Sequence, residues 1–140
     1  MKNYVEGTIA NHWFDYDVYI FCINGSVTSA RLNVMGKGCG KDFARAIPSL
    51  PSAIGEAILR TGLHCQVYQY VDHKIIAIPN KTLWFLEEDR ELIKESILKA
   101  KEWVKDDENV LVEFPLTNHY DKEMKIWLEE NLGDNYDVLI

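Results

Sequence analysis

The sequence predicts a three-layer α/β/α sandwich built around a mixed central sheet. Strand-like apolar runs alternate with helix-like patterns from residue 17 to the end of the chain, as in α/β proteins. The run Val18–Ile23 is almost continuously apolar, which is typical of a strand buried on both faces. A hairpin of Cys65–Tyr70 and Ile75–Ile78 interrupts the alternation, so we expect one antiparallel pair. With 140 residues, the chain is expected to form a single domain, 1–140.

The first half of the chain supplies a short strand, the central strand and two helical pieces. Asn3–Val5 is a possible strand, and Val18–Ile23 ends at the turn pair Asn24-Gly25. The next apolar pattern, Gly40–Ile47, predicts an amphipathic helix that Pro48 stops. Ser52–Leu59 then continues as a second helical piece.

The second half contains the clearest helix and two further strands. Glu87–Lys105 carries apolar residues at helical spacing, with acids leading and lysines trailing, as the helix dipole favours. Val110–Phe114 is apolar and β-branched, and Pro115 stops it. We expect a last helix over Lys122–Leu132 and a closing strand over Tyr136–Ile140.

Composition excludes several classes of protein. Apolar residues make up 47% and charged residues 26%, as in an ordinary globular protein. A net charge of −7 disfavours a broad nucleic-acid patch, which needs clustered Lys and Arg. Cys22, Cys39 and Cys65 form no C-x-x-C pair, so reduced thiols are expected and neither a metal site nor a cofactor is predicted. The absence of an apolar leader or membrane-length run predicts a cytoplasmic protein that does not bind a membrane.

A glycine-rich stretch, Asn33–Phe43, is the strongest functional signal. Gly36, Gly38 and Gly40 alternate between the central strand and the first helix. Glycines let a ligand approach the backbone, and a helix N-terminus favours an anion, most often a phosphate. The spacing matches neither a P-loop nor a dinucleotide fingerprint. A glycine turn that only packs the helix on the sheet therefore remains an alternative.

Unusual residues follow the ends of three predicted strands. They are the stretch from Asn24 to Gly40, the pair Asn80 and Lys81, and the segment Leu116–Asp121. Open α/β sheets bind ligands outside the carboxyl ends of their strands. The sequence therefore predicts one ligand site at this edge of the sheet.

Two stretches resemble a known family. Met35-Gly36-Lys37-Gly38, followed by Phe43 and Ile47-Pro48, resembles the V-M-G-K-G-I-A-x-x-F-x-x-x-F-P stretch of macrodomains. Lys81-Thr82-Leu83-Trp84 resembles their P-[TN]-K-x-x-W stretch, as found in the branch of ADP-ribose glycohydrolases and ADP-ribose 1″-phosphate phosphatases. The resemblance implies a macrodomain-like sandwich and, as partner, an ADP-ribose derivative or an ADP-ribosylated macromolecule.

The resemblance also implies roles for individual residues. Lys81 matches the catalytic lysine of the glycohydrolases, and Asp121 lies one position from the acid that partners it, although it also suits the N-cap of the following helix. His119 is the candidate acid/base of a phosphatase, and either Asn24 or Asn33 would hold the distal ribose. The remaining ligand contacts are expected from Met35, Gly36, Lys37, Gly38, Cys39, Thr117 and Asn118.

The chain departs from the family at two places. Thr8 stands where macrodomains carry the Asp that accepts a hydrogen bond from adenine, and the segment after Pro115 lacks the second glycine-rich loop. The expected function is binding of ADP-ribose or a derivative, with hydrolysis of an ADP-ribosyl linkage or of ADP-ribose 1″-phosphate. The alternative is a non-catalytic module that binds or sequesters such a nucleotide.

Overall fold

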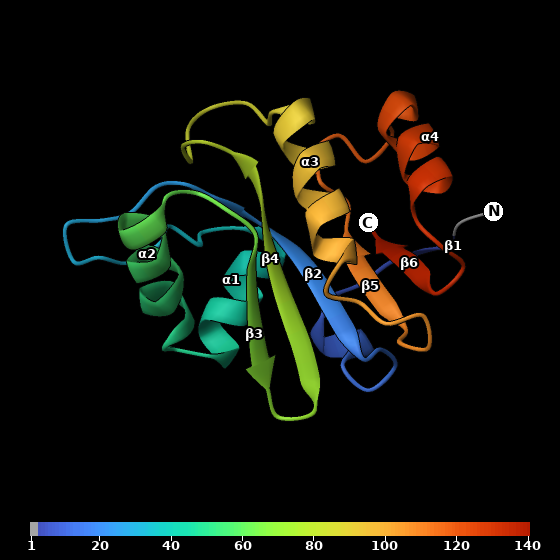
Figure 1. Cartoon of the computed structure of the whole chain (residues 1–140), viewed down its shortest axis with the longest axis horizontal. Coiled ribbons are helices and arrows are strands. Elements are labelled where there is room, and N and C mark those ends of the chain that lie inside the picture. The colour runs from blue at the N-terminus through green and yellow to red at the C-terminus, as the bar shows by residue number, and fades with distance from the viewer. Residues whose placement is uncertain (1–2) are drawn as a thin grey trace.

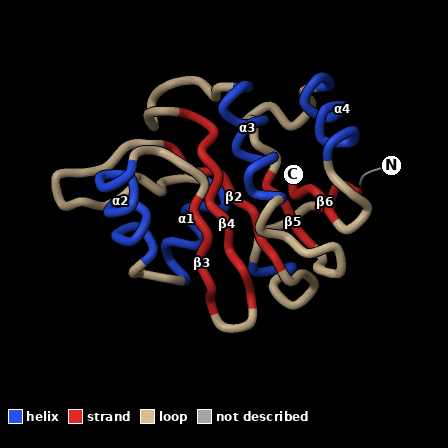
Figure 2. The backbone as a smooth tube through the Cα atoms, viewed as in Figure 1, coloured by secondary structure: helices blue, strands red, loops and turns tan. Residues whose placement is uncertain are grey.

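The computed structural model describes residues 3–140, which form a six-stranded mixed sheet with helices on both faces (Figures 1 and 2). The strands are β1 (Asn3–Val5), β2 (Val18–Asn24), β3 (Gln66–Tyr70), β4 (His73–Lys81), β5 (Val110–Glu113) and β6 (Tyr136–Leu139). The helices are η1 (Ala10–His12), α1 (Gly38–Ala46), α2 (Leu50–Thr61), α3 (Arg90–Lys101) and α4 (Lys122–Asn131). Within the described residues, no helix is long and apolar enough to cross a membrane.

The strand order β1-β6-β5-β2-β4-β3 puts the most apolar strand in the middle of the sheet. β2 pairs in parallel with both β4 and β5, and β6 pairs in parallel with β5 and β1. Only β3 runs antiparallel, through its hairpin with β4. The predicted mixed sheet is confirmed, and the five parallel strands all end at the same edge.

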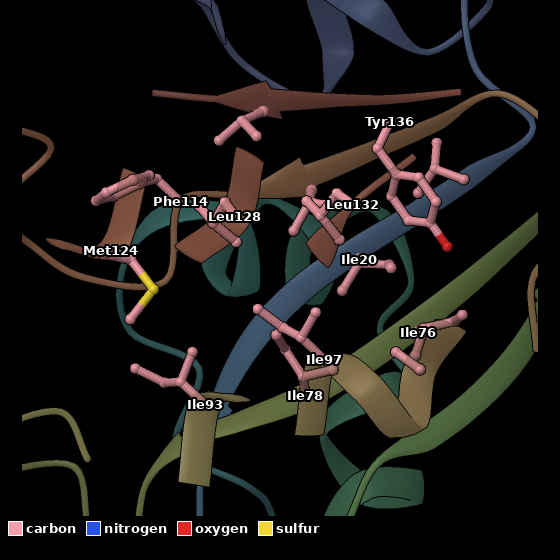
Figure 3. Packing of buried hydrophobic residues seen from close by; sticks show 14 of the residues in the cluster. Ile20, Ile76, Ile78, Ile93, Ile97, Phe114, Met124, Leu128, Leu132 and Tyr136 are labelled. Carbon is pink, nitrogen blue, oxygen red and sulfur yellow. The ribbon is translucent and has the colours of Figure 1, made fainter. Parts of the chain in front are cut away.

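Each face of the sheet packs against its own helical layer. On one face, Ile20, Ile76 and Val112 pack with residues of α3 and α4, and Figure 3 shows Ile93, Ile97, Met124 and Leu128 closing over this face. On the other face, Tyr19, Phe21 and Ala77 pack with Ile9 and with residues of α1 and α2. Figure 1 accordingly shows α3 and α4 in front of the sheet and α1 behind it. The three-layer sandwich predicted from the sequence is confirmed.

Some element boundaries differ from those predicted. The helix predicted over Glu87–Lys105 is shorter, because Asp89 caps it by accepting the backbone N–H groups of Glu91 and Leu92. β4 continues past Ile78 to Lys81, since its last residue still pairs with Asn24 of β2. Lys81 therefore belongs to the strand rather than to the loop that follows.

Candidate functional site

A cavity of about 830 Å³ lies at the carboxyl edge of the parallel strands. The glycine-rich turn and the ends of β2, β4 and β5 line it, which agrees with the expected position of a ligand site in an open α/β sheet. Most of the residues predicted from the sequence meet there: Asn24, Met35, Gly36, Lys37, Gly38, Cys39, Lys81, Thr117 and His119. Asn33, Asn118 and Asp121 are not among the lining residues.

The glycine-rich turn presents backbone to the cavity. A Cβ built on Gly36 meets no atom within 4 Å, so this position faces open space. Within residues 3–140, the N–H groups of Gly36 and Lys37 have no protein acceptor. A ligand oxygen can therefore take these two donors, with the Lys37 ammonium supplying charge.

Gly38 has a different role, because its surroundings are protein. Its φ of +59° lies in the left-handed region, and a Cβ there would meet Glu113 Oε2 at 2.7 Å. α1 begins at this residue with Lys37 as its N-cap. The glycine thus lets the chain enter the helix directly over the Glu113 carboxyl group.

Glu113, the last residue of β5, connects three segments of the site. Its Oε1 accepts the backbone N–H of Cys22 at 2.8 Å, and its Oε2 accepts the N–H of Cys39 at 3.1 Å. Burial raises the pKa of Glu113, although these hydrogen bonds oppose the shift. Burial and the nearby Glu113 also raise the pKa of the thiols of Cys22 and Cys39, so both are protonated and poor nucleophiles at neutral pH.

The two asparagines hold the loop between β2 and α1. Asn24 lines the cavity, donates to the carbonyl of Val34 at 2.8 Å and accepts the N–H of Ser26 at 2.9 Å. Asn33 is buried, and its amide donates to the carbonyls of Asn24 and Ser26. Of the two candidates for the distal ribose, Asn24 alone lies at the cavity.

Lys81 lies at the end of β4 with its partly buried side chain at the cavity wall. Glu88 also lines the wall and accepts both the backbone N–H of Thr117 at 2.6 Å and its hydroxyl at 2.8 Å. Burial raises the pKa of Glu88, but the bonds from Thr117 and the charge of Lys81 outweigh it and lower the pKa. An ionised carboxylate therefore accompanies Lys81, and the Thr117 donors are already engaged.

The segment after Pro115 is arranged differently from the prediction at Asp121. Asp121 caps α4 by accepting the N–H of Met124 at 2.8 Å and pairs with Arg90 at 2.6 Å. The bonds from Arg90 and the Met124 N–H lower the pKa of Asp121 to about 2. The N-cap role expected from the sequence is confirmed, and it holds this carboxylate outside the cavity. Asn118 is exposed and accepts the N–H of Tyr120, while His119 is exposed at the cavity rim.

Thr8, expected near adenine, lies at the cavity together with Leu139 and Ile140. Its hydroxyl donates to Asn11 Oδ1 at 3.1 Å and accepts the Asn11 N–H at 3.3 Å. This arrangement offers a base no charged acceptor. The cavity wall is therefore uncharged at Thr8.

Sequence reasoning missed Glu88 and Glu113, two carboxylates that line the cavity. A signal was available for Glu113, since a lone acid interrupts the apolar strand Val110–Phe114 at its carboxyl end. Glu88 lies in a loop, and no local pattern distinguishes it from its acidic neighbours. Among the described residues, no group of three or more His, Cys, Asp or Glu side chains is arranged to hold a metal ion.

Comparison with known proteins defines the class of fold. No protein-family model matches the chain, and a search of curated proteins finds no significant match. The structure resembles the macrodomain of Thermus aquaticus DarG, with a TM-score of 0.74 and 18% identity over 99% of this chain and 96% of that one. It also resembles the macrodomain of Mycobacterium tuberculosis DarG, with a TM-score of 0.70 and 18% identity over 99% and 97% of the two chains.

A third similar structure contains a ligand. Thermosipho africanus DarTG in complex with ADP-ribose has a TM-score of 0.69 and 15% identity to this chain, covering 99% of this chain and 42% of the DarTG chain. The architecture is that of an α/β/α sandwich with a cavity at the carboxyl edge of its sheet. More particularly, this chain has the macrodomain fold.

Proposed function

We propose that this protein binds ADP-ribose or a derivative in the cavity and hydrolyses an ADP-ribosyl linkage. The observation that carries the proposal is the meeting of Lys81, Asn24 and the Gly36–Gly38 turn at one cavity of a macrodomain fold. A similar structure, that of Thermosipho africanus DarTG, is in complex with ADP-ribose. The cavity volume of about 830 Å³ is within the range of sites that enclose ligands of this size.

The turn supplies the contacts to the ligand's oxygens. The N–H groups of Gly36 and Lys37 would bind phosphate or ribose oxygens, and the Lys37 ammonium would offset the diphosphate charge. Asn24 would orient the distal ribose through its position at the end of β2. The adenine would lie toward Thr8, where recognition depends on packing more than on charge.

Lys81 would act at the anomeric carbon of the distal ribose. In hydrolysis the C1″–O bond breaks, water supplies a hydroxyl group to C1″, and the leaving oxygen takes a proton. The Lys81 ammonium would donate that proton, or its amine would attack C1″ before water does. Glu88, whose pKa is lowered in part by the charge of Lys81, would serve as the acidic partner of the lysine, the role that the sequence suggested for Asp121.

A non-catalytic binding module is the second candidate, and two contacts favour it. Thr117 has both donors engaged by Glu88, and Asp121 is engaged by Arg90 away from the cavity. Fewer groups are therefore free to move protons than in the arrangement expected from the sequence. Such a site would still bind an ADP-ribose derivative through the turn.

Two measurements test the proposal in sequence. ADP-ribose at millimolar concentration should raise the melting temperature, because a ligand that binds only the folded state stabilises it. Wild type should then release ADP-ribose from DNA-linked or ester-linked substrates, and Lys81→Ala should abolish release while keeping ADP-ribose affinity within about tenfold. Lys122→Ala, at an exposed position of α4, is the matched control and should retain full release.

The outcomes separate the candidates. Binding without release by wild type would leave the binding module, and equal release by Lys81→Ala would move the chemistry to another residue. If neither ADP-ribose nor its derivatives change the melting temperature, both proposed functions are refuted, while the fold is unaffected.

A further inference from the structure

The loop between β4 and α3 carries a run of large apolar side chains that are exposed to solvent (Figure 1). Their exposed fractions are 39% for Leu83, 54% for Trp84, 63% for Phe85 and 42% for Leu86. Single apolar side chains are common on protein surfaces, but a group of them beside a cavity is typical of an interaction site. We call residues 83–86 the apolar loop.

The backbone of the apolar loop is held in place although its side chains are exposed. The N–H of Trp84 donates to Ser26 Oγ at 2.9 Å. The N–H of Leu86 donates to the carbonyl of Leu83 at 3.1 Å. The indole of Trp84 lies edge to face with the ring of Phe85, at 5.7 Å between centroids. Because the loop is already ordered, a partner that covers these aromatic rings would lose little affinity to the ordering of the loop.

The apolar loop is continuous with the candidate site. Trp84 lines the cavity together with Lys81, which lies three residues earlier in the chain. In the proposed function, Lys81 acts at C1″ of the distal ribose, so the group bonded to C1″ would lie on the same side of the cavity as Trp84. The macromolecule that carries the ADP-ribosyl group is therefore the occupant best placed to cover the apolar loop.

The charges beside the apolar loop restrict what can cover it. The next five residues, 87–91, comprise four acids and Arg90, and Arg90 already pairs with Asp121 at 2.6 Å. The whole chain carries a net charge of −7. This negative charge would repel a nucleic-acid backbone, an anionic lipid surface and a second copy of the same loop. It would attract a polypeptide segment that carries Lys or Arg side chains.

We propose that the apolar loop binds the polypeptide that carries the ADP-ribosyl group, through a segment with apolar side chains next to the modified residue and Lys or Arg side chains outside them. Phe85 and Leu86 would contact the apolar side chains, and the exposed Glu87 would lie near the basic ones. The proposal rests on the proposed function, because it takes the scissile linkage to lie at Lys81. It narrows the substrate to a linkage on a polypeptide, in preference to one on DNA.

Calorimetry with a stable conjugate tests this surface. The probe is a short peptide with Leu and Phe on either side of its central residue and Lys outside them. The central residue is joined to C1″ of ADP-ribose by a carbon–carbon bond, which is not hydrolysed. Wild type should bind this conjugate about tenfold or more tightly than free ADP-ribose. It should bind ADP-ribose joined in the same way to a single-stranded oligonucleotide no more tightly than free ADP-ribose.

Two variants, each with a matched control, locate the contact. Phe85→Ser should weaken binding of the peptide conjugate about tenfold and leave the affinity for free ADP-ribose unchanged, because Phe85 does not line the cavity. Phe14→Ser makes the same change at a residue that is 92% exposed and precedes β2, and should alter neither affinity. Glu87→Lys should weaken conjugate binding about threefold or more at low salt, and less at high salt. Glu130→Lys, at an exposed position of α4, is its control.

The outcomes distinguish this proposal from the proposed function. If wild type binds the peptide conjugate no more tightly than free ADP-ribose, or if Phe85→Ser binds it as tightly as Phe14→Ser, the role of the apolar loop is overturned while the proposed function stands. Tighter binding of the oligonucleotide conjugate than of the peptide conjugate overturns the choice of a polypeptide. If wild type binds neither free ADP-ribose nor the conjugates, the proposed function itself fails. The wild-type comparison decides the matter even if the variants prove unstable.

Discussion

Alanine substitutions at Gly36 and Gly38 should have opposite consequences, although the two glycines are only two residues apart. At Gly38 the new methyl group must adopt φ near +59° and would lie 2.7 Å from Glu113 Oε2. The left-handed conformation costs about 1 kcal/mol for alanine. Displacing the carboxylate from the N–H groups of Cys22 and Cys39 adds about 1–3 kcal/mol. We therefore expect Gly38→Ala to lower the free energy of unfolding by about 2–4 kcal/mol.

At Gly36 the methyl group meets nothing within 4 Å. The free energy of unfolding should stay within about 0.5 kcal/mol of wild type, as for most exposed substitutions. The methyl group would, however, project where a ligand oxygen approaches the backbone N–H. ADP-ribose affinity should fall by about tenfold or more, since one hydrogen bond to a charged group is worth about 1.5–3 kcal/mol.

Urea unfolding and calorimetry measure the two effects separately. A lower midpoint at constant m-value reports the stability change in Gly38→Ala. In a Glu113→Ala background, Gly38→Ala should lower the free energy of unfolding by only about 1 kcal/mol, which is the cost of the left-handed backbone conformation for alanine. A stable Gly38→Ala would refute the contact with Glu113, and a Gly36→Ala protein with unchanged ADP-ribose affinity would show that the ligand does not approach this turn.

Three further predictions concern other parts of the chain. Calorimetry should find that ADP-ribose and its hypoxanthine analogue bind within about fivefold, because the Thr8 hydroxyl is neutral and engaged by Asn11; a larger preference for adenine would point to another acceptor. Melting temperatures should fall in the order wild type, Asp121→Asn, Asp121→Ala, since asparagine keeps the cap but loses the charge paired with Arg90. The pKa of Asp121 is lowered to about 2, so the stability that its charge adds to the folded state is present above the unfolded pKa of about 3.9 and is lost as the pH falls toward 2. If wild type still melts at a higher temperature than Asp121→Asn below that pH, the difference does not come from the charge of Asp121. Val71→Asn should raise the free energy of unfolding by about 0.5–1 kcal/mol in urea, because a β-branched residue occupies φ of 54° in the β3–β4 turn; no gain would mean that the turn relaxes without strain.

The sequence predicted those features that depend on a long local pattern. Val18–Ile23 was recognisable as the central strand because side chains on both of its faces are buried. The hairpin was recognisable from a short turn between two apolar runs. The start of α3 was not, because Asp89 is one of three consecutive acids, and only the structure shows that its side chain is the one that caps the first turn. The residue at which such a helix begins depends on which of several similar side chains makes the capping hydrogen bond.

The candidate site, too, could be predicted from the sequence only in part. Lys81 and the glycine-rich turn follow strand ends, so a site at their common edge could be predicted before their distances were known. The choice between Asn24 and Asn33 depended on how the intervening loop folds back, which the loop's own polar composition does not determine. The loss of Asp121 from the site depended on Arg90, a residue of another helix. Contacts between distant segments of this kind leave no periodicity in the sequence.

The two carboxylates that sequence reasoning missed explain how the turn stays ordered without a second glycine-rich loop. Glu88 accepts both donors of Thr117, and Glu113 accepts N–H groups from β2 and α1. In each case a protein acid satisfies backbone donors that would otherwise need a ligand or water. These hydrogen bonds therefore organise the site without a ligand, and the same N–H and hydroxyl donors are not available to one. Under the proposed function, the backbone N–H groups of Gly36 and Lys37 would contribute to ligand affinity, and this is why the alanine substitution at Gly36 is a sharp test of the site.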